Sequence, residues 1–183
     1  MEFAKIVALC IVAAIVYGIA HDMVTAHVCV EYFTIGHPRV IASEAPVLLA
    51  LAWGVLATWW MGLLLGIPLA VVSRAGRRPR LRAADLVRPI AVVLGAMAAA
   101  ALAAGLVGRA LAATGNVWLL DPMASRVPAA RHTAFLTDLW AHNAAYLAGL
   151  VGGIVLCVLT WRRRGRIERR TETLSPKDAP QCC

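Results

Sequence analysis

The chain has 183 residues, of which 61% are hydrophobic, and its mean hydropathy is +0.73. This composition is too apolar for an ordinary soluble domain and predicts an integral membrane protein. The formal net charge is +8, but no RNA- or DNA-reading motif accompanies the arginines, so nucleic acid is not an expected partner.

Four hydrophobic runs follow one another, at about 6–20, 45–72, 89–113 and 139–161. A helix that crosses a bilayer needs roughly 20 mostly apolar residues, which the last three runs supply. The first run is shorter, but apolar sequence resumes at Met23, so this helix can extend from residue 5 to Phe33. We therefore expect an all-α polytopic membrane protein: one four-transmembrane-helix bundle over residues 1–170, followed by a disordered cytoplasmic tail over 171–183.

Basic residues divide unevenly between the two sides of such a bundle. By the positive-inside rule, the basic side with both termini faces the cytoplasm, and segments 21–44 and 114–138 face the periplasm or the cell exterior. The expected location is the inner (plasma) membrane, with anionic lipid head groups bound at the arginine clusters. Fourteen of the 18 basic residues lie on the basic side: Lys5, Arg74, Arg77, Arg78, Arg80, Arg82, Arg88, Arg162, Arg163, Arg164, Arg166, Arg169, Arg170 and Lys177.

A cleavable signal peptide is the alternative to a first span. Lys5 lies in a weakly basic leader, Ile6–Ile19 is an apolar core, and Gly18-Ile19-Ala20 resembles a cleavage site. Cleavage there would leave three spans and make His21 the amino terminus, where an α-amine and an imidazole together can chelate copper.

All five histidines lie on one predicted side of the membrane: His21, His27, His37 and His132 outside the hydrophobic runs, and His142 at the outer end of the last one. If the first helix continues to Phe33, His27 and Glu31 are four residues apart and share a face. An imidazole and a carboxylate at this spacing can bind one metal ion, as in di-metal helical bundles. His21 and Asp22 are expected as supporting or alternative ligands.

Asp138 and His142 repeat this spacing in reverse order at the start of the fourth run. Packing of the first and fourth helices at their outer ends would bring His27, Glu31, Asp138 and His142 together, with His132 as a further ligand. Imidazoles and carboxylates suit a divalent transition metal: zinc, iron, manganese or copper. In a catalytic site, Glu31 or Asp138 would be the proton acceptor.

Each of these residues also has a structural explanation. Histidine and aspartate at helix ends can cap helices, pair with a nearby arginine or contact interfacial water, and without metal such a set could relay protons. The stretches His21–Pro38 and Asp138–His142 resemble a group of small four-span bacterial membrane proteins. The resemblance implies a bacterial inner-membrane setting and carries no activity, substrate or ligand set.

Three classes of function follow from the sequence. The first is a membrane-embedded metalloenzyme, a hydrolase or an oxidoreductase, in which the ion activates water or oxygen. The alternative is a non-catalytic metal-binding protein or accessory subunit that docks on a membrane-protein partner or forms a homo-oligomer. The second alternative is a small transporter or proton-relay component, although the spans contain few internal polar groups for such a path.

Two features inside the spans concern packing. Arg109 is the only charge within the last three runs, so we expect it either to pair with a carboxylate of the histidine-bearing side or to extend to the interface. Gly62 and Gly66, like Gly149 and Gly153, form G-x-x-x-G pairs that predict close helix contacts.

Overall fold

The computed structural model describes residues 1–174, and within them the chain forms helices and no strand. Four helical stretches are long and apolar enough to cross a membrane: Glu2–Val28, Pro46–Arg74, Ala84–Ala113 and Ala129–Thr171. The predicted all-helical fold with four candidate spans is confirmed at this level. The elements are α1 (Glu2–Val28), α2 (Val30–Thr34), α3 (Pro46–Leu56), α4 (Trp59–Arg74), α5 (Ala84–Ala113), α6 (Met123–Arg126), a 3₁₀ turn (Ala129–Arg131) and α7 (His132–Leu174).

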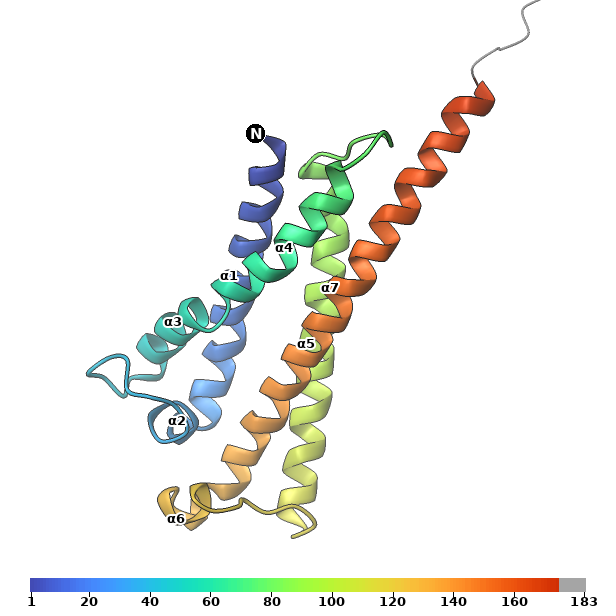
Figure 1. Ribbon diagram of the computed structural model, residues 1–183. Coiled ribbons are helices and arrows are strands. Elements are labelled where there is room, and N and C mark those ends of the chain that lie inside the picture. Colours follow the sequence, from blue (N-terminus) through green and yellow to red (C-terminus); the bar gives the residue numbers. More distant parts are fainter. Residues whose placement is uncertain (175–183) are drawn as a thin grey trace, which may run out of the picture.

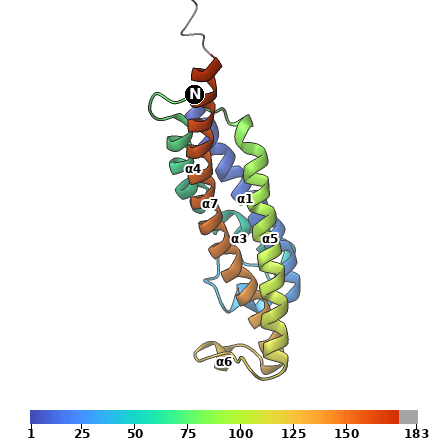
Figure 2. The ribbon, with the colours of Figure 1, turned by 90° about the vertical axis from the view of Figure 1, so that its right-hand side faces the viewer.

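The helices gather their connections at two ends (Figures 1 and 2). We call one the arginine end, which holds the N-terminus, the α4–α5 connection and the last turns of α7. We call the other the histidine end, which holds α2, the start of α3, α6 and the start of α7. The helix of α7 continues through the arginine-rich segment because arginine and glutamate favour helix. The helix includes residues 171–174 of the predicted tail, and the rest of the tail lies outside the described residues.

Two helix pairs form the body of the protein, with α1 along α3 and α4, and α5 along α7. Glycines allow the close approach in both pairs. A Cβ on Gly62 would lie 2.6 Å from the Ile11 Cα, and one on Gly108 would lie 2.5 Å from the Trp140 ring. The predicted small-residue contacts are therefore packing contacts between helices of one chain.

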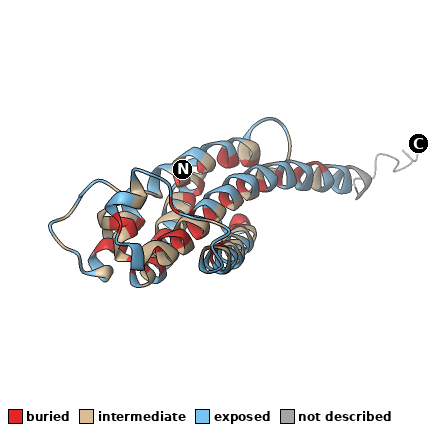
Figure 3. Cartoon of the chain, turned by 90° about the horizontal axis from the view of Figure 1, so that it is seen from below, coloured by how far each residue is buried: buried red, intermediate tan, exposed pale blue. Residues whose placement is uncertain are grey.

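Buried residues concentrate where the helices face one another, and the outward faces are exposed (Figure 3). Many exposed residues are large and apolar, such as Val92, Leu102 and Leu147, as a lipid-facing surface requires. One core cluster fills the histidine end, around Phe33, Leu136 and their neighbours. A second cluster fills the arginine end, where Ile6, Leu86 and Leu156 meet.

The first helix ends earlier than expected. Cys29 adopts an extended conformation (φ −147°, ψ 94°), so α1 stops at Val28 and the short α2 follows at an offset. The predicted continuous helix through Phe33 was wrong. The break frees the carbonyl of Val28, and the Arg131 guanidinium of the distant 3₁₀ turn donates a hydrogen bond to it at 3.0 Å. A side chain about 100 residues away thus satisfies the interrupted helix.

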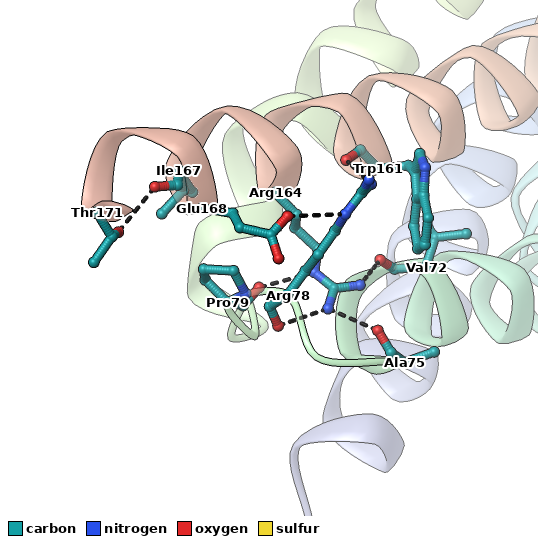
Figure 4. Close-up of polar contacts among 9 residues, drawn as sticks. All are labelled: Val72, Ala75, Arg78, Pro79, Trp161, Arg164, Ile167, Glu168 and Thr171. Carbon is teal, nitrogen blue, oxygen red and sulfur yellow. Dashed lines mark hydrogen bonds and ion pairs between the residues drawn. The ribbon is translucent and has the colours of Figure 1, made fainter. Parts of the chain in front are cut away.

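A fully buried arginine closes the arginine end (Figure 4). Arg164 of α7 uses its whole guanidinium to bind backbone carbonyls at the end of α4 and in the α4–α5 connection. Beside it, Arg78 pairs with Glu168 at 3.3 Å and lies over the Trp161 ring. The acceptors of Arg164 are the carbonyls of Val72, Ala75, Arg78 and Pro79, the last three at 2.8 to 2.9 Å.

Arg109 differs from the prediction of an ion pair. Its side chain is exposed on α5, and it has no salt bridge to any of the described carboxylates. The long aliphatic stem near the end of a span suits extension to the interface.

Candidate functional site

Three of the predicted residues meet between α1 and α7. His21 and Asp22 lie in the last two turns of α1, and His142 lies in the third turn of α7. One ligand atom from each side chain can be chosen so that all three lie within 4.8 Å of one another. Asp22 and His142 are buried, and His21 is half-buried. The three side chains therefore form a compact His/Asp/His group near the histidine end.

Hydrogen bonds fix the orientation of His142. Its Nδ1 lies 2.9 Å from the carbonyl oxygen of Asp138, one turn earlier in α7, so Nδ1 carries the hydrogen. Its Nε2 lies 3.2 Å from Asp22 Oδ1. A ring held through Nδ1–H presents the Nε2 lone pair to a metal ion, or shares a proton with Asp22.

His21 has a free ring nitrogen inside the protein. Its Nε2 is buried and has no hydrogen-bond partner, and the same is true of the Tyr17 hydroxyl one turn earlier. The two rings stack at 5.8 Å, and the His21 ring meets the His142 ring edge-on at 4.5 Å. Buried polar atoms are nearly always partnered, so this pair of atoms indicates a place for a ligand.

Aromatic side chains cover the group from the histidine end. The rings of Tyr32 and Phe33, on α2, lie 4.5 Å and 5.8 Å from the His142 ring. His37 binds the Tyr32 carbonyl through Nδ1 at 2.8 Å and contacts the Trp53 ring at 4.8 Å. The break at Cys29 turns α2 so that the rings of Tyr32 and Phe33 lie against His142.

On its other side the group opens into a cavity of about 150 Å³ between the two helix pairs. His21, Asp22 and His142 line one end of this cavity, and Cys10, on the same helix, lines the other. Cys10 and His21 are eleven positions apart, which is about 16 Å along the helix. Apart from the polar end and Thr58, the lining is apolar, and it includes Ala13, Met61, Leu65, Val93, Met97 and Gly149.

Asp138 is fully buried on α7, yet neither carboxylate oxygen has a hydrogen-bond partner in the protein. A bare carboxylate in such surroundings is costly, so this carboxyl requires a proton, a water molecule or a cation. Its backbone carbonyl orients His142, but its side chain is not part of the compact group. Its predicted role as a metal ligand therefore has no support from the geometry, and its role as a proton acceptor stays a prediction.

The other predicted ligands have partners elsewhere. His27 is exposed and places Nδ1 2.6 Å from the carbonyl of Met23, while His132 places Nε2 2.9 Å from the carbonyl of Val127. Glu31 pairs with Arg131 at 2.9 Å. The expected four-residue set is thus not the one that the fold brings together, because the helix break places Glu31 on a different helix from His27 and Arg131 pairs with it.

Burial and nearby hydrogen bonds shift the pKa of two further side chains at this break, Glu31 and Cys29. Desolvation raises the pKa of Glu31, but hydrogen bonds from its own backbone N–H, Arg131 and Cys29 outweigh it and hold the pKa below the ordinary 4.5. Glu31 is therefore an anion committed to Arg131. Burial raises the pKa of the Cys29 thiol to about 12, so this cysteine is not a thiolate ligand at neutral pH.

The donor set fits a transition metal. Two imidazoles and one carboxylate are the protein ligands of many catalytic zinc and non-haem iron sites, which keep further positions open. Two atoms bound to one ion at about 2.0–2.2 Å are at most roughly 4.4 Å apart, so a group that extends to 4.8 Å must contract slightly on binding. The open positions would face the cavity.

Tyr17 and Tyr32 were missed in the sequence, although a signal existed for the first. Tyr17 and His21 are four residues apart, so their common helix face could have been identified. Tyr32 reaches His142 only because the helix breaks at Cys29.

Comparisons of the chain with protein-family models, curated proteins and solved structures found no match. The case for a function therefore depends on the residues of the site.

Proposed function

We propose that the chain is an integral membrane protein that binds one divalent transition metal ion through His21, Asp22 and His142. The observation that carries this proposal is the compact His/Asp/His group, with an unpartnered His21 Nε2, at the end of an apolar cavity. Zinc and iron fit this donor set best. The proposal replaces His27, Glu31, Asp138 and His132 as ligands but retains the metal class that the sequence predicted.

The ion would supply Lewis-acid or redox chemistry, which makes a membrane metalloenzyme, a hydrolase or an oxidoreductase, the preferred functional class. With three protein ligands, positions remain for a water molecule and a substrate. The dry surroundings of Tyr32 and Phe33 would strengthen the interaction of the ion with a bound oxygen atom. A metal-binding accessory subunit would use the same ligands without turnover.

Elemental analysis of the detergent-purified full chain tests the proposal. We expect one zinc or iron ion per chain in the wild type, and background metal in His21→Ala and His142→Ala. His27→Ala and His132→Ala serve as matched controls, because these imidazoles bind backbone carbonyls elsewhere, and they should retain the metal. Equal loss in the controls, or no metal in a folded wild type, would refute it.

A metal-free proton relay is the second candidate. It is favoured by the direct contact of His142 Nε2 with Asp22 Oδ1, because each nitrogen of His142 then faces an oxygen atom. In this case His142 and Asp22 would share a proton. A folded wild type without metal, together with proton flux in vesicles that Asp22→Asn abolishes, would favour the relay.

For orientation we propose that the arginine end faces the cytoplasm, in the inner membrane of a bacterium. Most basic residues of the chain belong to this end, and the positive-inside rule applies to short connections such as the one between α4 and α5. The exposed arginines there would bind anionic lipid head groups. Arg164 is an exception, because its guanidinium is buried and engaged with the backbone.

A further inference from the structure

The cavity beside the His/Asp/His group has the shape and chemistry of a binding site for a chain. It extends along about 16 Å of α1, from His21 to Cys10. It is therefore elongated, which suits an unbranched hydrocarbon chain better than a compact ring system.

The two ends of the cavity differ in polarity. Near the arginine end its lining is apolar, with Ala13, Val93 and Leu156 among its residues. At the histidine end it meets His21 Nε2 and the Tyr17 hydroxyl, both buried and both without a partner. A ligand that matches both ends has one hydrocarbon chain and a small head group with an oxygen atom.

The packing of the protein leaves space for such a chain. The two large core clusters lie at the two ends, and the cavity lies between them. Met61 of α4 and Met97 of α5 both line the cavity, and they belong to different helix pairs. Flexible methionine side chains adapt to a ligand with little strain.

We propose that this cavity binds the hydrocarbon chain of a single-chain membrane amphiphile, with its oxygen-bearing head group beside Tyr17 and His21. The proposal deepens the proposed function, since it names the class of molecule that would reach the metal ion, and the role of the head group as a metal ligand rests on that function. Binding of the chain itself does not require the ion. The surrounding bilayer would supply this class of molecule directly.

The charge of the head group separates the two proposals. Without a metal ion, the described lining of the cavity offers an anionic head group no lysine or arginine, so an alcohol should bind and a carboxylate should not. A divalent ion at the site adds positive charge, so that a carboxylate can become a ligand. Hexadecanol therefore tests the cavity, and palmitate tests the metal at its end.

The experiment uses the full chain in phosphatidylcholine vesicles, with hexadecanol and palmitate probes that carry a photoreactive diazirine near the chain end. Cross-linked residues are identified by mass spectrometry. We expect hexadecanol to label the lining of the cavity around Ala13 and Val93, with or without EDTA, and excess unlabelled hexadecanol to remove the label. Palmitate should label the same residues only after zinc or iron is added.

Variants that fill the cavity provide the control. Met61→Trp should lower hexadecanol labelling of the lining by about tenfold, which corresponds to roughly 1.4 kcal/mol. Leu64→Trp, on the exposed face of the same helix, should leave it unchanged. Met97→Trp blocks the cavity from α5 and gives a second test if Met61→Trp does not fold.

Equal labelling of the lining in Leu64→Trp and in a folded blocking variant would overturn the cavity proposal, as would labels confined to lipid-facing residues. Hexadecanol labelling of the lining with no effect of metal on palmitate would support the cavity proposal and reject the metal site.

Discussion

Arginine side chains that look alike in the sequence have different roles in the structure. Arg164 belongs to a run of exposed basic residues, but its guanidinium is fully buried and donates hydrogen bonds to the carbonyls of four residues. Arg109 lies within an apolar run, but it is exposed. The position of an arginine relative to charge clusters and hydrophobic runs in the sequence therefore does not predict whether its side chain is buried. Burial depends on whether backbone carbonyls converge around the guanidinium in the fold.

Arg164→Gln should destabilise the protein by about 3–5 kcal/mol, because it leaves buried carbonyls without donors. The matched control is Arg166→Gln, two residues along the same helix and exposed. Thermal unfolding in detergent should show a large decrease in melting temperature for the first variant only. Equal melting temperatures would contradict the role of Arg164 in fixing the α4–α5 connection.

The ion pair between Glu31 and Arg131 predicts sensitivity to acid. The pKa of Glu31 is lowered in the folded protein, so this carboxylate stabilises the fold above about pH 4.5 and loses that contribution as the pH falls through its folded-state pKa. Both side chains are partly exposed, so the contribution is about 1 kcal/mol. Unfolding curves at pH 7 and at pH 3 should differ less in Glu31→Gln than in the wild type, whereas Glu44→Gln, at an exposed position, should behave like the wild type.

At the scale of helices, contacts of glycine decide how closely α1 and α4 approach. Gly62 packs against the backbone of Ile11, whereas nothing lies within 4 Å of a Cβ built on Gly95. Alanine favours a helix over glycine by up to about 1 kcal/mol. Gly95→Ala should therefore be neutral or stabilising.

Gly62→Ala has the same gain in helix preference but forces the two helices apart, and overpacking of this kind costs about 1–3 kcal/mol. We expect a lower melting temperature for Gly62→Ala than for Gly95→Ala in the same detergent. The opposite order would show that α1 and α4 can separate without loss of stability.

The helices could be predicted from hydropathy because each span is long, apolar and bounded by polar residues. The break at Cys29 could not, since Val28 and Glu31 are held by Arg131, a residue far along the chain. The candidate site, likewise, could be predicted from the sequence only in part. His142 and Asp22 could be recognised in the sequence as candidate ligands, but their meeting depends on how α1 packs on α7, which the spacing of residues within one helix does not report.

Across the whole molecule, exposed apolar side chains, charged side chains and the cavity lie in different places. Apolar side chains cover the outward faces of the long helices, and charge gathers at the arginine end, while the cavity runs between the helix pairs. In the proposed membrane setting, this arrangement would give a molecule from the bilayer access to the interior, where it would meet the His/Asp/His group at the end of the cavity.

The orientation of the whole molecule gives the last prediction. With four spans and a cytoplasmic arginine end, reporter fusions after Arg82 and after Lys177 should read as cytoplasmic, and a fusion within 114–130 should read as external. Cleavage after Ala20 would instead remove most of α1 and leave three spans. Two spans, α5 and α7, still separate Arg82 from Lys177 in that form, so the fusions would read the same, and an external reading at Lys177 with a cytoplasmic reading at Arg82 would instead contradict a span in α5 or α7. The amino-terminal sequence of the purified protein identifies the cleaved form: a terminus at His21 would mean that α1, which lines the cavity from Cys10 to Asp22, is lost from the bundle, and an intact terminus would mean that the cavity keeps this wall.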